Sequence, residues 1–300
     1  MKMDSGSMIS HSSPEIVVVI ATSMCRTNLL LERSLCSVYN QTGVDKFSIS
    51  LVVVDDNVPL PNGLSGEFYR IQEGIKKLRD HLSLSPDEFQ TFVLANNRTR
   101  GNSGTGAWNT GIYFAFEQNP ESYVSILDDD DEYLPNHLND CIQEIRKSSH
   151  LQAVFQRMYW LHEDGTKMEL PLKKKQLIPE AFFIGNPGVQ GSNMFFKSSV
   201  LVEIGAFNER YPNTTDREIM IRFLKYIEVN ELNNSITVIE TEGVIHYNHK
   251  TEKVNNNLER KQKGLELFYR EHQKDFSEAA YQASLERAKR FFSYQPTTVL

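Results

Sequence analysis

The chain of 300 residues has few cysteines and no long apolar run. Cys25, Cys36 and Cys141 are odd in number and widely spaced, which excludes a disulfide framework and a zinc pattern built on cysteine. No apolar stretch approaches the roughly 20 residues that a membrane-spanning helix needs. The polar, serine-rich residues 1–14 lack the apolar core of a signal peptide. We therefore expect a cytoplasmic protein with a disordered tail at 1–14, for which only peripheral membrane contact stays open.

The chain also lacks an excess of positive charge. It has 32 Lys and Arg residues against 39 Asp and Glu residues, a formal net charge of −7. This balance argues against nucleic acid as a partner. The sequence has no internal repeat and no low-complexity tract, and its length is ample for a buried core. Oligomeric state stays open, because amphipathic C-terminal helices could pair across a dimer or cap the core.

The pattern that is present alternates strands and helices. Continuous β-branched runs predict buried strands, and apolar residues at helical spacing predict helices between them. In the first half these segments are strands at 15–21, 48–54, 91–95 and 123–127, and helices at 28–40, 68–82 and 107–117. The order favours an α/β fold with a mostly parallel sheet covered by helices. The less regular second half predicts a hairpin at 153–161 and 167–170, a strand at 192–196, and helices at 216–229, from 251 onward and at 276–292.

Four consecutive aspartates, Asp128 to Asp131, follow the strand at 123–127 directly. Their mutual repulsion must be offset by water or by a cation, so the run is either a solvated turn or a metal site. A second strand ends in Asp55 and Asp56, and parallel strands bring such ends to one edge of the sheet, where ligands bind. Carboxylate oxygens suit Mg²⁺ or Mn²⁺, which commonly bridge a carboxylate and substrate phosphates.

The order and spacing of the motifs resemble glycosyltransferase family 2, a large inverting family with the GT-A fold. The segments that carry the resemblance are VVVIAT (17–22), RSLCSVYNQT (33–42), VVVDDN (52–57), AWNTGI (107–112), ILDDDDEYLP (126–135), GSNMFFKSSVLVEIGAFNE (191–209), TDREIMIRF (215–223) and YNH (247–249). The resemblance implies a Rossmann-like, mixed but mostly parallel sheet with a C-terminal helical extension. It implies a GT-A domain at 15–250, with a nucleotide-sugar-binding half at 15–135, an acceptor half at 136–250, and helices at 251–300.

The resemblance also implies roles for single residues on the donor side. Thr22 matches a residue that contacts the nucleotide base, and Asp56 matches the carboxylate that accepts the base N–H, usually of uracil. Asp128, Asp129 and Asp130 fit the family's D-x-D motif: Asp128 near ribose or metal, Asp129 between them, and Asp130 as the direct ligand of Mn²⁺ or Mg²⁺. Asp131 is expected behind this site or in solvent. The remaining expected donor contacts are Asn109 and Arg100.

On the acceptor side, Asp216 matches the family's catalytic base, which takes the proton of an acceptor hydroxyl during one inverting displacement. An ordinary helix N-cap is the alternative for Asp216. His249 matches a histidine that contacts metal or diphosphate in some relatives, and an ordinary surface histidine is the alternative. A zinc pair of His246 and His249 is disfavoured, because no Cys or carboxylate lies at supporting spacing. Asn193 is also expected near the acceptor.

Several departures from the family pattern limit the prediction. Residues 21–26 lack the family's aromatic ring, so the nucleotide stays open although a UDP-sugar is expected. Trp108 stands where the family has an arginine, so Arg98 or Arg100 is left to supply positive charge to the diphosphate. Trp108 itself either stacks on a sugar or packs in the core. Residues 59–88 form an unusually long insertion. The acceptor, whether saccharide, lipid-linked or another hydroxyl compound, is not readable from the sequence.

Three other classes of protein compete with a glycosyltransferase. A sugar-phosphate nucleotidylyltransferase usually carries a glycine-rich loop after its first strand, and residues 21–27 contain no glycine. A non-catalytic sugar- or nucleotide-binding module is disfavoured by the intact acidic motif and Asp216. An EF-hand needs a central glycine and a terminal glutamate at spacings that the acidic run does not offer. A metal-dependent nucleotide-sugar glycosyltransferase is therefore the leading hypothesis.

Overall fold

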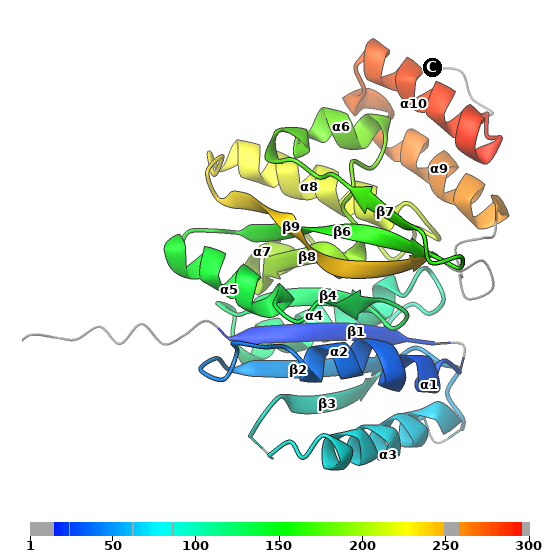
Figure 1. Cartoon of the computed structure of the whole chain (residues 1–300). Helices are drawn as coiled ribbons and strands as arrows, with labels where there is room; N and C mark the ends of the chain where they lie inside the picture. Colours follow the sequence, from blue (N-terminus) through cyan, green and yellow to red (C-terminus); the bar gives the residue numbers. More distant parts are fainter. Residues whose placement is uncertain (1–14, 24, 62, 86, 249–257, 296–300) are drawn as a thin grey trace, which may run out of the picture.

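The computed structural model describes residues 15–23, 25–61, 63–85, 87–248 and 258–295. The predicted tail at 1–14 and the candidate residue His249 lie outside the described residues. The chain folds into one curved sheet of nine strands with helices on both faces (Figure 1). The main strand order is β3-β2-β1-β4-β8-β6-β9-β5, and β7 pairs with β6 beside this path. The predicted α/β class with a mixed, mostly parallel sheet is confirmed.

The first half of the sheet is parallel. Its strands are β1 (Ile16–Thr22), β2 (Ile49–Asp55), β3 (Gln90–Ala95) and β4 (Tyr123–Asp128). In the register, Val19 of β1 lies between Val52 of β2 and Ile126 of β4. Alternate side chains of β1 enter two different cores, one containing Val17 and Val19 and the other Ile16, Val18 and Ile20. Helices cover both faces, which explains the continuous apolar runs of these strands.

The helices of this half begin close to the predicted positions. Residues 27–39 form one helical segment made of α1 (Thr27–Leu29), a π-helical stretch η1 (Leu30–Leu35) and α2 (Cys36–Tyr39). The others are α3 (Gly66–His81) and α4 (Thr105–Gln118). Helix α4 lies close to β1 at Gly111, where a Cβ atom would stand 2.4 Å from Cγ1 of Val19. Glycine at this position lets the two elements approach.

The second half of the sheet mixes strand directions. Strand β8 (Met194–Lys197) runs antiparallel to both β4 and β6 (Ala153–His162). Strand β9 (Ile236–Asn248) runs parallel to β6 and antiparallel to β5 (Glu132–Tyr133). The predicted hairpin is confirmed, since β7 (Lys167–Leu170) pairs antiparallel with β6. The long strand β9 was not predicted, because Glu240, Thr241, Glu242 and Gly243 divide it into two short apolar runs.

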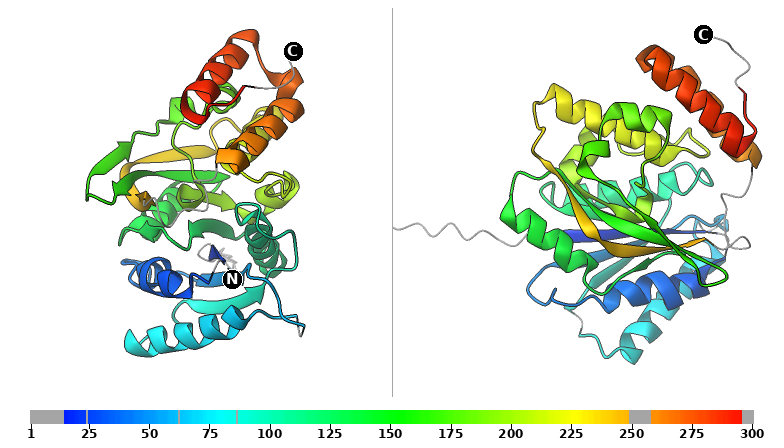
Figure 2. Two further views of the ribbon diagram at one scale, coloured as in Figure 1. Left: turned by 90° about the vertical axis from the view of Figure 1, so that its right-hand side faces the viewer. Right: turned by 45° about the horizontal axis from the view of Figure 1, so that its top comes forward.

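Four helices and two 3₁₀ turns of the described residues complete this half. They are α5 (His137–Lys147), α6 (Pro179–Ile184), α7 (Ser198–Glu203), α8 (Thr215–Val229) and the 3₁₀ turns η2 (Lys174–Gln176) and η3 (Gly191–Asn193). The C-terminal pair is α9 (Leu258–His272) and α10 (Glu278–Phe292), joined by η5 (Gln273–Asp275). Figure 1 shows α9 beside α8 and α10 beside α6, at the end of the molecule opposite β3 and α3, and Figure 2 shows the same end from two other sides. None of the described helices is long and apolar enough to cross a membrane.

Candidate active site

A cleft of about 1080 Å³ opens at the carboxyl ends of β1, β2 and β4. The parallel register places these ends side by side, because Thr22 pairs with Asp55 across β1 and β2 and Ala21 pairs with Asp128 across β1 and β4. The far wall comes from the β6–β7 hairpin, the start of α8 and the helices α9 and α10. Of the predicted residues, those that line the cleft are Thr22, Asp56, Arg100, Trp108, Asp128, Asp129, Asp130 and Asp216.

Asp56 is a buried carboxylate on the first wall. It accepts hydrogen bonds from Nδ2 of Asn96 at 2.5 Å and from the backbone N–H of Gly101 at 3.2 Å. Nη1 of Arg100 lies 3.7 Å from Asp56 Oδ1. Burial raises the pKa of Asp56, and the hydrogen bonds and Arg100 oppose that rise. The preceding Asp55 instead holds the loop, accepting from Asn57 N at 3.0 Å and from the Ser65 hydroxyl.

The acidic run is partly neutralised by an arginine that the sequence analysis did not single out. Arg26 donates to both carboxylate oxygens of Asp129, and its Nη1 donates to Asp130 Oδ2 at 3.1 Å. Arg33 donates to the backbone oxygen of Asp130 at 2.9 Å. Asp129 is buried, and burial raises its pKa to about 7 although Arg26 opposes the rise. The sequence did offer a signal for Arg26, because it is a basic residue four positions after the end of the first strand.

Asp131 is fully buried, so the expectation that it could lie in solvent is wrong. Its Oδ2 accepts from the Ser192 hydroxyl at 2.6 Å and contacts Nδ1 of His246 at 2.8 Å. The backbone N–H of Tyr247 donates to its other oxygen at 3.3 Å. Strand β9 brings His246 to the acidic run from more than 100 positions away, which no local sequence pattern shows. No carboxylate lies at supporting sequence spacing from His246, and its carboxylate partner is brought to it by the fold instead.

Asp128, Asp131 and His246 offer ligand atoms that lie within 4.8 Å of one another. Two carboxylates and an imidazole suit a divalent cation such as Mn²⁺. Asp128 also faces Asp130, Asp131 and Asp216, and burial together with these like charges raises its pKa well above the usual range. Carboxylates under such repulsion are stabilised by a positive charge, so the residues present fit a divalent cation. Asp130 lies at the same edge, with a side chain 14% exposed.

Asp216 lies in the first turn of α8, and Thr214 occupies the N-cap position. The N-cap alternative for Asp216 therefore does not apply. Thr214 has a φ of 72°, a left-handed conformation that is costly for a β-branched residue. Oδ1 of Asp216 is buried with no hydrogen-bond partner among the described residues. Burial raises the pKa of Asp216 to about 6, opposed by the charges of Lys261 and His246.

Two other candidate residues lie away from this cleft. The amide of Asn109 donates to the backbone oxygen of Phe207 at 2.8 Å and accepts from its N–H at 2.9 Å, beside a separate surface hollow. Asn193 is buried and donates to the backbone oxygens of Gln156 and Gly188. Both amides thus tie backbone segments together.

Trp108 packs in the core and also lines the cleft. Its ring packs 5.0 Å from Phe207 and also lines the cleft. Its indole N–H has no hydrogen-bond partner in the part of the chain that the structure describes. A buried indole N–H normally finds a partner, so this donor is available to a ligand in the cleft.

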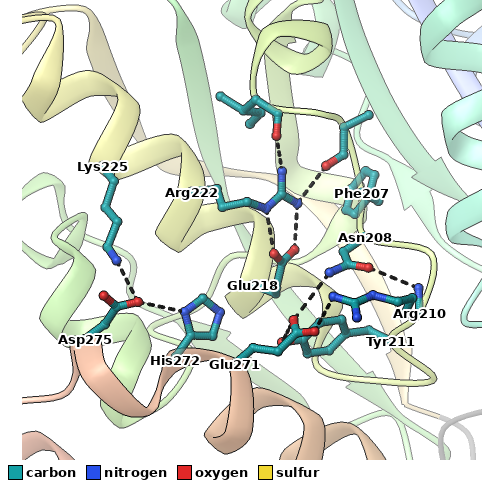
Figure 3. A network of polar contacts seen from close by, with 12 residues as sticks. Phe207, Asn208, Arg210, Tyr211, Glu218, Arg222, Lys225, Glu271, His272 and Asp275 are labelled. Atoms are coloured by element: carbon teal, nitrogen blue, oxygen red, sulfur yellow. Dashed lines mark hydrogen bonds and ion pairs between the residues drawn. The ribbon is translucent and has the colours of Figure 1, made fainter.

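Polar contacts tie η5 to α8 and the end of α9 to the loop before α8 (Figure 3). Arg222 of α8 donates twice to Glu218, and Lys225 pairs with Asp275 at 2.9 Å. Glu271 of α9 accepts from the Tyr211 hydroxyl at 2.9 Å. The wall that α9 and α10 contribute to the cleft is therefore held to the domain by bonds to α8 and to the loop before it.

Comparisons with known proteins agree with this architecture. Residues 17–205, more than half of the chain, match the family model described as Glycosyl transferase family 2. No curated protein matches the sequence. Among solved structures, the chain is similar to S. aureus TarS, with a TM-score of 0.60 and 17% identity over 94% of this chain and 44% of that chain.

The chain thus spans less than half of that TarS chain. It is also similar to TarS 1–349 in complex with UDP, with a TM-score of 0.58, 16% identity, and coverage of 94% of this chain and 72% of that one. For TarS 1–349 in complex with UDP-GlcNAc the TM-score is 0.62 at 17% identity, over 94% and 73% of the two chains. At this level of identity the likeness shows the fold.

Proposed function

The chain belongs to glycosyl transferase family 2, and on that premise we propose that it moves a sugar from a nucleoside diphosphate donor to an acceptor hydroxyl. The observation that carries this proposal is the gathering of Asp56, Asp128, Asp130 and Asp216 around one cleft. A uridine nucleotide is the expected donor moiety, since structures of similar fold hold UDP and UDP-GlcNAc. We assign residues 15–135 to the donor half and 136–250 to the acceptor half, with the helices α9 and α10 added to the latter.

The donor half supplies oriented polar groups for the nucleotide. Asp56 is the acceptor for the base N–H, and Asn96 and Gly101 hold its carboxylate in place. Thr22 at the end of β1 contacts the base, and Asp128 lies nearest the ribose. Arg100 stands beside Asp56 and contributes positive charge toward the nucleotide.

A Mn²⁺ or Mg²⁺ ion is held by the acidic run in this proposal. Asp130 is the ligand implied by the D-x-D motif, and Asp128 and His246 complete the donor set. Asp131 holds the His246 ring through Nδ1, an arrangement that commonly orients a metal-binding imidazole. When bound, such an ion neutralises charge on the leaving diphosphate. Arg26 keeps Asp129 and Asp130 in position by pairing with both.

Asp216 acts as the general base. It takes the proton from the acceptor hydroxyl as that oxygen attacks the anomeric carbon, and one displacement inverts the configuration. Its pKa of about 6 leaves it ionised at neutral pH and still basic enough to receive a proton. The unpartnered Oδ1 offers the acceptor hydroxyl a hydrogen-bond acceptor. Trp108 offers its ring and its N–H to the substrate in the same cleft.

Calorimetry with UDP in the presence and absence of Mn²⁺ tests the proposal. We expect UDP to bind, and binding to require the metal. A thermal-shift screen of nucleotide sugars with Mn²⁺ then identifies the donor, since a ligand raises stability according to its affinity and concentration. No binding of UDP with Mn²⁺ would contradict the uridine assignment. Binding without any transfer or hydrolysis of the donor would favour the alternative, a non-catalytic sugar- or nucleotide-binding member of the family.

A further inference from the structure

The cleft has a basic wall opposite its acidic edge. Four cationic side chains of the C-terminal half line it: Arg217 of α8, Arg260 and Lys261 of α9, and Arg287 of α10. The acidic edge comes from strand ends, whereas the basic wall comes from the start of α8 and from the C-terminal helices α9 and α10, which Figure 1 shows at the end of the molecule opposite β3. The cleft therefore separates opposite charges onto two sides, and the ligand must satisfy both.

Among the described residues, Arg287 and Lys261 form no ion pair with a carboxylate. Arg287 is half-buried, and its guanidinium lies 5.0 Å from the ring centre of Phe291 and 5.9 Å from that of Phe292. Nζ of Lys261 donates to Oδ1 of Asn213 at 2.7 Å and stands 4.9 Å from the ring centre of Phe292. Within the described part of the chain, no carboxylate forms an ion pair with either side chain. Buried charges are normally paired, so an oxyanion would offset this burial.

The position of Lys261 assigns the wall to the acceptor rather than to the donor. Its partner Asn213 lies three residues before Asp216, and the positive charge of Lys261 acts on Asp216. On the other side of the cleft, Arg26 already pairs with the acidic run. Burial lowers the pKa of Lys261 to about 8, the charges of Arg217 and Arg287 lower it further, and the charge of Asp216 opposes the fall.

We propose that the acceptor carries an oxyanion, either a phosphate or a carboxylate, which binds Arg287 and Lys261 beside the hydroxyl that receives the sugar. This inference rests on the proposed function and names the acceptor class of that site. A guanidinium binds either oxyanion through two parallel N–H donors, and an ammonium adds a point charge. Phe291 is 58% exposed and gives the carbon skeleton of the acceptor an apolar surface.

The test uses the full chain saturated with UDP and Mn²⁺, so that donor binding is established first. Glycerol, glycerol 3-phosphate and glycerate are then titrated by calorimetry. We expect glycerol 3-phosphate, glycerate or both to bind at least about tenfold more tightly than glycerol, and the tighter of the two identifies the oxyanion. Equal affinity for all three probes, or binding of none, would overturn the proposal while leaving the UDP result, and thus the proposed function, intact.

Arg287→Gln and Arg290→Gln make a matched pair on α10. Both arginines lie close to 5 Å from the Phe291 ring, but Arg290 is exposed and does not line the cleft. We expect Arg287→Gln to weaken binding of the favoured probe about tenfold and Arg290→Gln to leave it unchanged. Equal loss in both variants would reveal a non-specific charge effect. An equal loss of UDP affinity in Arg287→Gln would assign this arginine to the donor diphosphate. Either result overturns the proposal.

Discussion

The two halves of the sheet build their sides of the cleft in different ways. In the first half, parallel strands in register end side by side, so the chain places Thr22, Asp56 and Asp128 directly where β1, β2 and β4 stop. In the second half, Asp216 comes from a helix start and Lys261 from a helix that packs against it. Strand ends position the first side locally, whereas packing between distant elements positions the second. Substitutions on the two sides should therefore have different consequences.

The largest effect is expected on the strand-end side. Asp130→Ala should abolish metal-dependent UDP binding and reduce transfer by roughly 10⁴-fold, because metal stabilisation of a leaving group contributes several kcal/mol. The exposed Asp45 provides a control, and Asp45→Ala should change neither property. Calorimetry with UDP and Mn²⁺ and an assay of UDP release measure both. Normal turnover in Asp130→Ala would remove this residue from the metal site.

A substitution of Asp216, on the helix side of the cleft, should affect the chemical step but not donor binding. Asp216→Asn should retain UDP and Mn²⁺ binding but lose transfer by roughly 10³-fold, the usual contribution of a general base. Single-turnover measurement with bound donor separates the two steps. Unchanged transfer would exclude Asp216 as the base, and lost UDP binding would show that both halves contribute to the donor site.

Asp131 tests the contact that joins the two halves, because it lies on the acidic run and holds His246 of β9. Asp131→Asn should weaken Mn²⁺-dependent UDP binding by about 10- to 100-fold, as removal of a residue that orients a metal ligand usually does. The melting temperature should be recorded in parallel, since Asp131 is fully buried. An affinity for Mn²⁺ and UDP equal to that of the unaltered protein would exclude His246 as an oriented ligand.

The smallest expected effect is a shift in the pH profile. Protonated Asp216 cannot accept a proton, so transfer should fall as the pH drops, with a midpoint near its pKa of about 6. The positive charge of Lys261 lowers this pKa, so Lys261→Met should move the midpoint to higher pH. Lys263 lies on the same helix but is exposed and pairs with Glu259, so Lys263→Met is the control. A midpoint that is unmoved or lower in Lys261→Met would contradict the assigned coupling.

The same difference between halves explains what could be predicted from the sequence. The parallel strands and the cleft position of Asp56, Asp128 and Asp130 follow from apolar runs and the acids that end them. The contact of His246 with Asp131 depends on the register of β9, which local periodicity does not encode. Lys261 and Arg287 reach the cleft through packing of α9 and α10. The sequence predicted these segments as amphipathic helices but did not indicate what they pack against. Sequence patterns thus revealed strand-end residues and missed residues brought in by long-range packing.

The parallel pairing of β6 with β9 has a consequence for the order in which the protein becomes active. The two strands are separated by residues 163–235, and contacts of such long sequence separation form slowly. The strands β1 to β4 can pair during synthesis well before β9 exists. The cleft gains His246 only when β9 docks, and Arg287 only when α10 does. A nascent chain would therefore form the strand-end side of the cleft before it forms the wall made by α9 and α10. Sugar transfer would then begin only once the whole chain has folded.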